Sequence, residues 1–151
     1  ILNRWVRPAI GANLYGWCRR RLDSDSMHEA SQALLGKHDF SAFRSAGCSS
    51  QHAMREVTSI AVTRNLDMVI IDITANAFLY HMVRNIVGSL LDIGRGEQSI
   101  EWLAEILQGR DRKVAGVTAE SQGLYFKNVR YDPKYNLPSD AEAFPFAGKH
   151  L

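Results

Sequence analysis

The chain has 151 residues, of which 46% are hydrophobic and 9% aromatic, which is enough to bury a core within one domain. The formal net charge at pH 7 is only +2, but residues 1–64 carry nine Lys and Arg against five Asp and Glu, which permits a surface that faces a polyanion. We recognise no signal peptide and no membrane-spanning run, and therefore expect a cytoplasmic protein with no membrane partner. Two cysteines without a Cys-x-x-Cys pair argue against a zinc site or a disulfide framework.

The first third of the chain predicts one strand and one helix. Apolar and polar residues alternate over residues 1–7 as in a strand, which Pro8 would end, and the stretch that follows to Arg21 shows no clean period. Asp23 or Ser24 can cap a helix whose apolar residues recur at helical spacing until Gly36. Residues 37–51 predict a loop with two buried phenylalanines, because polar turn-forming residues surround them.

The clearest pattern is a β-hairpin, in which two alternating runs, 55–64 and 68–73, flank a short turn. A helix is expected from about Phe78 to Ile93, and Ser99 would cap another through Leu107. Residues 123–131 predict a last strand, and residues 136–151 an irregular tail outside a domain of residues 1–135. This order predicts an α+β fold of the ferredoxin-like split βαβ type, with an antiparallel sheet and helices on one face.

Arg84 is the residue that most needs an explanation. From Ala75 to Leu91 it is the only side chain charged at neutral pH, in a helix that is apolar nearly all round. An unpaired buried charge costs several kcal/mol, so Arg84 requires a carboxylate or a phosphate. One interpretation is an ion pair with Asp72 or Asp92, and the other is a site arginine that holds an anion supplied from elsewhere. His81 lies one turn before it and is a weaker candidate.

Three motifs, in this order and at these separations, resemble the C-terminal half of the tRNA pseudouridine synthase A family. They are His38-Asp39-Phe40-Ser41-Ala42-Phe43-Arg44, Ala75-Asn76-Ala77-Phe78-Leu79-Tyr80-His81-Met82-Val83-Arg84-Asn85-Ile86-Val87-Gly88 and Thr118-Ala119-Glu120-Ser121-Gln122-Gly123-Leu124-Tyr125-Phe126. The resemblance covers nearly the whole chain to about Pro138. It implies an isomerase that converts uridine to pseudouridine in the anticodon arm of tRNA, at positions thirty-eight to forty, without a metal or a cofactor.

The resemblance also implies what lies outside these residues. The nucleophilic aspartate of the family belongs to an Arg-Thr-Asp-x-Gly-Val-His motif in an N-terminal domain, and that motif is not found in this sequence. A fragment without that domain is expected to be inactive alone. The full-length protein is expected to form a homodimer whose two ferredoxin-like halves in each chain surround a basic cleft.

The resemblance assigns roles to individual residues. Arg84 would pair with the absent aspartate, and Leu124 would lie beside the target uracil. His81, Arg44 and Arg55 are hypothetical contacts to the RNA. Two other classes of function stay open from the sequence alone, namely a free-standing RNA-binding module and a protein-interaction domain whose open sheet edge pairs with another copy.

Overall fold

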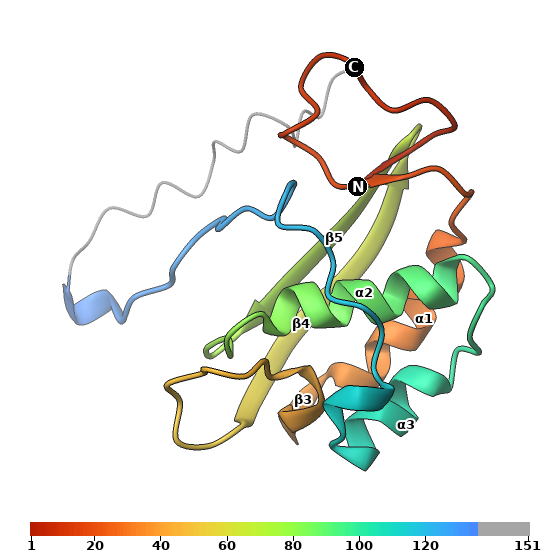
Figure 1. Ribbon diagram of the computed structural model, residues 1–151. Helices are drawn as coiled ribbons and strands as arrows, with labels where there is room; N and C mark the ends of the chain where they lie inside the picture. Colours follow the sequence, from red (N-terminus) through yellow and green to blue (C-terminus); the bar gives the residue numbers. More distant parts are fainter. Residues whose placement is uncertain (136–151) are drawn as a thin grey trace.

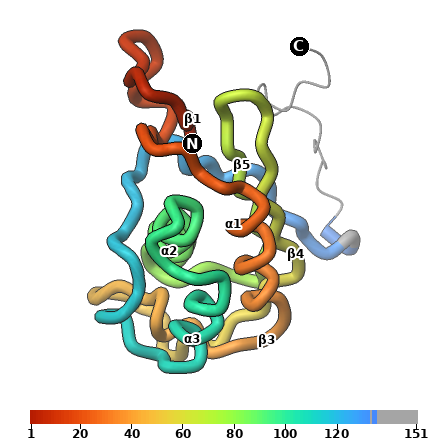
Figure 2. Tube along the Cα trace, turned by 90° about the vertical axis from the view of Figure 1, so that its right-hand side faces the viewer, coloured from red at the N-terminus to blue at the C-terminus, as the bar shows by residue number. Residues whose placement is uncertain are grey.

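The computed structural model describes residues 1–135, in which three helices pack on one face of a five-stranded sheet (Figures 1 and 2). The sheet order is β2-β1-β5-β4-β3. The strands are β1 (Leu2–Asn3), β2 (Trp17–Cys18), β3 (Gly36–Asp39), β4 (Met54–Asn65) and β5 (Met68–Ala75). The helices are α1 (Ser24–Ser31), α2 (Met82–Gly94) and α3 (Trp102–Gly109), with short 3-10 turns at Gln32–Leu34, Ser41–Phe43, Arg112–Val114 and Pro133–Tyr135. The α+β class is therefore confirmed.

The β4–β5 hairpin forms the centre of the sheet, as the alternation predicts (Figure 1). A register shift between Val57 and Ser59 interrupts the ladder. A bulge adds one residue to one strand and reverses the alternation beyond it. Val57 and Ile60, which are three residues apart, can for this reason both face the buried side of the sheet.

The helices supply the other half of the core. Asp23 caps α1 by accepting hydrogen bonds from the backbone of Asp25 and Ser26, as expected. The two phenylalanines expected to be buried, Phe40 and Phe43, have no exposed surface. No helix among residues 1–135 has both the length and the apolar character needed to cross a bilayer.

Three predictions about the strands are wrong in detail. The strand expected over residues 1–7 is formed only at β1, and β2 arises in the stretch without a clean period. The sheet is mixed rather than purely antiparallel, because β1 and β2 run parallel while the other pairs are antiparallel. Residues 36–39, which include part of the expected loop, form β3 along the edge of β4. These short strands depend on their neighbours in the sheet, and alternation within a few residues cannot reveal that.

The strand expected over residues 123–131 is not formed either. In the structure these residues are exposed and have no ladder partner among the described strands. A strand requires a neighbour that accepts and donates backbone hydrogen bonds, and the local pattern supplies only one side of that pairing. The tail expected at residues 136–151 lies outside the described residues.

Candidate functional site

The site begins where α2 begins. The expected helix start at Phe78 is wrong, since tertiary contacts hold the preceding residues outside the helix. The N–H of Tyr80 points to Cys48 Sγ at 3.5 Å, and its carbonyl accepts a hydrogen bond from the N–H of Ser45 at 3.2 Å. His81 then takes a left-handed conformation with φ 58°, which is uncommon for a residue other than glycine. The helix consequently begins at Met82.

Arg84 lies in the first turn of α2 and is half-buried. Its Nε donates to the carbonyl oxygen of Ala119 at 2.7 Å, and its Nη1 lies 3.1 Å from His81 Nε2. Because a guanidinium nitrogen can only donate, His81 Nε2 is the acceptor in this arrangement. No carboxylate oxygen of residues 1–135 lies within 4.0 Å of the Arg84 guanidinium.

The two acids that could have neutralised Arg84 are bound elsewhere. Asp72 on β5 accepts a hydrogen bond from Lys127 Nζ at 2.6 Å, and Asp92 near the end of α2 pairs with Arg95. Burial is the largest cause that raises the pKa of Asp92, and Arg95 opposes it. The alternative of a structural ion pair between Arg84 and either acid is therefore wrong.

A backbone segment lies directly against α2. A Cβ at Gly88 would collide with the carbonyl oxygen of Val117, and a Cβ at Gly116 would lie 2.7 Å from the backbone nitrogen of Ser89. The absence of side chains at both glycines lets the segment 116–119 approach the helix closely. This approach brings the Ala119 carbonyl to Arg84, while the Ala119 N–H donates to the carbonyl of Arg84 at 3.1 Å.

Next to Arg84 on α2, the buried side chain of Asn85 forms hydrogen bonds that fix the segment 116–119. Asn85 has no exposed surface, and its Oδ1 accepts from Arg112 Nη2 at 3.1 Å and from Thr118 Oγ1 at 2.6 Å. Its Nδ2 donates to the carbonyl of Phe43 at 2.8 Å and lies 3.2 Å from Ser45 Oγ. One amide therefore connects α2, the 3-10 turn at Ser41–Phe43 and the segment that contacts Arg84.

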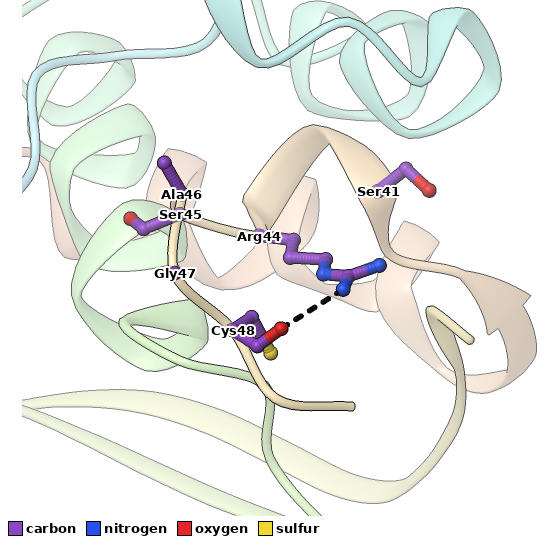
Figure 3. Close-up of a pocket in the computed structure, with 6 residues that line it drawn as sticks. All are labelled: Ser41, Arg44, Ser45, Ala46, Gly47 and Cys48. Carbon is purple, nitrogen blue, oxygen red and sulfur yellow. Dashed lines mark hydrogen bonds between the residues drawn. The ribbon is translucent and has the colours of Figure 1, made fainter. Parts of the chain in front are cut away.

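The predicted RNA contacts Arg44 and Arg55 converge on the loop around Ser50. Arg44 Nη2 donates to the carbonyls of Cys48 at 3.1 Å and Ser50 at 2.6 Å, at the rim of an open pocket lined by Ser41, Arg44, Ser45, Ala46, Gly47 and Cys48 (Figure 3). Arg55 Nη2 donates to Ser50 Oγ at 2.6 Å, and Arg55 is only 8% exposed. Its buried Nε has no hydrogen-bond partner among the described residues.

The same pocket contains Cys48, whose thiol receives the Tyr80 N–H described above. The amide N–H groups of Tyr80 and Ser50 lower the pKa of Cys48, and Arg44 acts in the same direction. The loop that carries Arg44 is thereby connected to the start of α2, through Tyr80 and through the contacts of Ser45.

Leu124 lies five residues after Ala119 in the sequence, and its side chain is half exposed. Its neighbour Gly123 packs against the 14–16 turn, where an added Cβ would lie 2.6 Å from the Gly16 nitrogen. The hydroxyl of Tyr125 donates to the carbonyl of Leu14 at 2.8 Å. No hydrogen bond joins Leu124 to Arg84 among the described residues, and the backbone from Ala119 to Leu124 connects them along the chain.

The structure therefore brings His81 and Arg84 together and ties Arg44 to the same helix start. Asn85 was missed as a site-forming residue, although it had a signal in the sequence. It is a polar residue at a position of the helix where apolar residues face the core. Among residues 1–135, no group of three or more His, Cys, Asp and Glu side chains is placed to hold a metal ion.

Comparison with known proteins identifies the class to which this fold and site belong. Residues 30–132 match the family model of tRNA pseudouridine synthase, so the chain belongs to the tRNA pseudouridine synthase family. It is 53% identical over 140 residues to tRNA pseudouridine synthase A of Xylella fastidiosa strain M23, which covers 93% of this chain and 54% of the relative. It is also 51% identical over 140 residues to tRNA pseudouridine synthase A of Stenotrophomonas maltophilia strain K279a, with 93% of this chain and 55% of the relative covered. The chain thus spans about half the length of these relatives.

Proposed function

We propose that this chain is the C-terminal, site-completing half of a tRNA pseudouridine synthase that isomerises uridine in the anticodon arm, at positions thirty-eight to forty. The observation that most supports this proposal is the environment of Arg84, whose half-buried guanidinium lies on an apolar helix. A carbonyl and an imidazole hold this guanidinium, and it pairs with no carboxylate of the described residues. Such a group favours an anion at its free edge. The nucleophilic aspartate of an N-terminal half is the anion we propose.

The arrangement suits that partner because it fixes the guanidinium before the anion arrives. Two of the three guanidinium nitrogens of Arg84 donate to Ala119 and His81, and no group of residues 1–135 accepts a hydrogen bond from Nη2. A positive group at a fixed position lowers the pKa of a nearby carboxyl, and so keeps it ionised when the closed site removes water. Only the ionised form can attack the ribose or accept a proton from it.

The remaining residues fit a role in holding the RNA. The target base must leave the stack, and Leu124 offers an exposed apolar side chain that can pack against a uracil ring. Arg44 is placed at the rim of the pocket where a backbone phosphate can reach it, and His81 is stacked on the half-exposed ring of Tyr80, with ring centroids 3.9 Å apart. Arg55 is a proposed contact whose guanidinium is buried beneath the Ser50 loop, so it would act chiefly by shaping that loop.

The same proposal implies the partners, the location and the oligomeric state of the full-length protein. The partners are the anticodon arm of tRNA and the N-terminal half, in a cytoplasmic homodimer that needs neither a metal nor a cofactor. A free-standing RNA-binding module is the second candidate, and the two make different predictions for the isolated chain. The module would bind tRNA tightly alone, whereas half of a cleft binds weakly and with a strong dependence on salt.

The test compares the chain alone with the chain joined to the N-terminal half of the Stenotrophomonas maltophilia relative. Each is incubated with unmodified tRNA transcript, and pseudouridine is detected by chemical labelling and primer extension. We expect no pseudouridine from the chain alone and turnover at the anticodon arm from the joined protein. Turnover by the isolated chain, or none by a folded joined protein that binds tRNA, would contradict the proposal.

A further inference from the structure

The N-terminal segment of the chain forms a basic and aromatic surface away from Arg84. Residues 1–21 contain five arginines and no Asp or Glu. In the structure this segment stands at one end of the molecule, beyond the helices (Figures 1 and 2). β1 and β2 run side by side through it, with Leu2 opposite Trp17 and Asn3 opposite Cys18.

Arginine and tryptophan side chains in and next to these two short strands contact each other. The Arg19 guanidinium lies 3.5 Å from the ring centroid of Trp5, and the Arg7 guanidinium lies 5.9 Å from that of Trp17. Trp17 Nε1 also donates to the carbonyl of Arg4 at 3.0 Å, which joins β2 to the residues that follow β1. We call these five residues the Arg/Trp face: Arg4, Trp5, Arg7, Trp17 and Arg19.

The guanidinium groups of this face are available for an anion. Those of Arg4, Arg7 and Arg19 lie more than 4.0 Å from every carboxylate of residues 1–135, and all three residues are exposed. Arg20 provides the contrast, because it pairs with Glu97 and donates to the carbonyl of Arg95 at 3.1 Å.

We propose that the Arg/Trp face is a second RNA contact surface, which binds backbone phosphates and one stacked base of the substrate outside the target uridine. A guanidinium stacked on an indole keeps its N–H edge free for phosphate oxygens. Trp5 is 70% exposed, so a base can stack on its ring. An acid-free surface with this combination favours RNA over a second copy of the chain, whose own surface here is equally basic.

The position of the face supports this assignment, which rests on the proposed function. The turn at residues 14–16 packs against Gly123, and Tyr125 binds the carbonyl of Leu14. Leu124, the proposed neighbour of the target base, lies between these two contacts. RNA that reaches Leu124 can therefore continue onto the Arg/Trp face without crossing an acidic surface within the segment.

The test measures the affinity of the isolated chain for a fluorescent unmodified tRNA transcript between about 50 and 200 mM salt. Arg19→Ala should weaken binding by about five-fold and reduce the salt slope by about one, as expected when one phosphate contact is lost. Arg20→Ala is the matched control and should stay within about two-fold of wild type, because that guanidinium is already paired. Trp5→Ala should weaken binding by about five-fold or more without changing the salt slope, and Trp5→Phe should restore most of it.

Three results would overturn the proposal. Equal losses for Arg19→Ala and Arg20→Ala would mean a diffuse charge effect, and unchanged affinity for Arg19→Ala and Trp5→Ala would mean that RNA does not reach this face. Self-association that is lost in Arg19→Ala while tRNA affinity is kept, as measured by light scattering, would make it a protein surface. These readouts need no turnover, so they can be told apart from a failure of the joined protein to form pseudouridine.

Discussion

The two ends of α2 treat an arginine in opposite ways. At the end of the helix, Arg95 pairs with Asp92 and with Glu97, whose Oε2 lies 3.0 Å from Arg95 Nε. At the start, Arg84 is held by the Ala119 carbonyl and by His81. The first arrangement neutralises its charge within the chain, whereas the second keeps the charge and fixes its direction. The comparison teaches that two arginines at opposite ends of one helix can differ fully in their partners, one held by carboxylates and the other by a carbonyl and an imidazole.

The largest expected effect comes from breaking the close approach between the middle of α2 and the segment 116–119. Gly88→Ala places a Cβ against the Val117 carbonyl, which must move together with the segment that holds Arg84. We expect a loss of about 3 kcal/mol or more in the free energy of unfolding, measured by urea denaturation. Gly109→Ala, near the end of α3 with nothing within 4 Å of the added Cβ, is the control and should be neutral or slightly stabilising. Similar midpoints for the two variants would contradict the close packing.

The next effect concerns the buried junction beneath Arg84. Asn85→Ala removes the acceptor of Arg112 and Thr118 and the donor to Phe43, leaving buried polar groups unpaired. We expect a loss of about 2–3 kcal/mol in the free energy of unfolding. Asn76→Ala, an exposed residue whose Oδ1 accepts one backbone hydrogen bond, should cost no more than about 1 kcal/mol. Equal losses in the free energy of unfolding for Asn85→Ala and Asn76→Ala would mean that the Asn85 junction stabilises the fold no more than one exposed hydrogen bond does.

A smaller effect is the pH dependence of stability, which should differ between variants of Arg95 and of Arg84. The side-chain hydrogen bond from Arg95 is the largest cause that lowers the pKa of Glu97 from its ordinary value of 4.5. A lowered pKa means that this stabilisation is present above pH 4.5 and is lost as pH falls through the lower value of the folded state. The destabilisation caused by Arg95→Gln should therefore shrink as pH falls from about 5 to about 3. That of Arg84→Gln should stay constant over the same interval.

Urea midpoints of both variants and of wild type at several pH values make this measurement. A difference for Arg84→Gln that shrinks in parallel with that of Arg95→Gln would reveal an acid in the described part of the chain that neutralises Arg84. Arg84 and Arg95 would then both be neutralised by acids of this chain, and the difference between the two ends of α2 would disappear.

The smallest expected change in stability is at Leu124. Because this side chain is half exposed, Leu124→Ala should change the free energy of unfolding by no more than about 0.5 kcal/mol. In the joined protein, the same substitution should reduce kcat/KM for tRNA by about ten-fold, since it removes an apolar contact to the target base. Unchanged kcat/KM would remove Leu124 from the proposed site.

The sequence predicted the elements whose stability is local. The β4–β5 hairpin and the three helices follow from residues that repeat at a clear period, and Asp23 caps α1 as its position indicates. The helix start at Met82 could not be predicted, because Cys48 and Ser45 hold Tyr80 outside the helix from a distant part of the chain. For the same reason the alternating residues 123–131 suggested a strand, although no partner strand is present among the described residues.

The sequence was sufficient to predict Arg84 and His81 as candidate site residues, but not the contacts that hold them in place. Arg84 and His81 follow from one unusual charge on an apolar helix and from its neighbour one turn away. The support from Ala119 and Asn85 required the close approach at Gly88 and Gly116, which joins segments about thirty residues apart. Contacts of this kind depend on backbone geometry, and a single sequence does not reveal which glycine serves them.

The central claim is that Arg84 is held ready for an anion from outside this chain. The most direct measurement is kcat/KM for unmodified tRNA in the joined protein, for wild type, Arg84→Gln, Arg84→Lys and Arg95→Gln. We expect Arg84→Gln to lose about 100-fold or more, Arg84→Lys to recover part of that loss, and Arg95→Gln to remain within about three-fold of wild type. An Arg84→Gln protein that is folded and as active as wild type would contradict the claim.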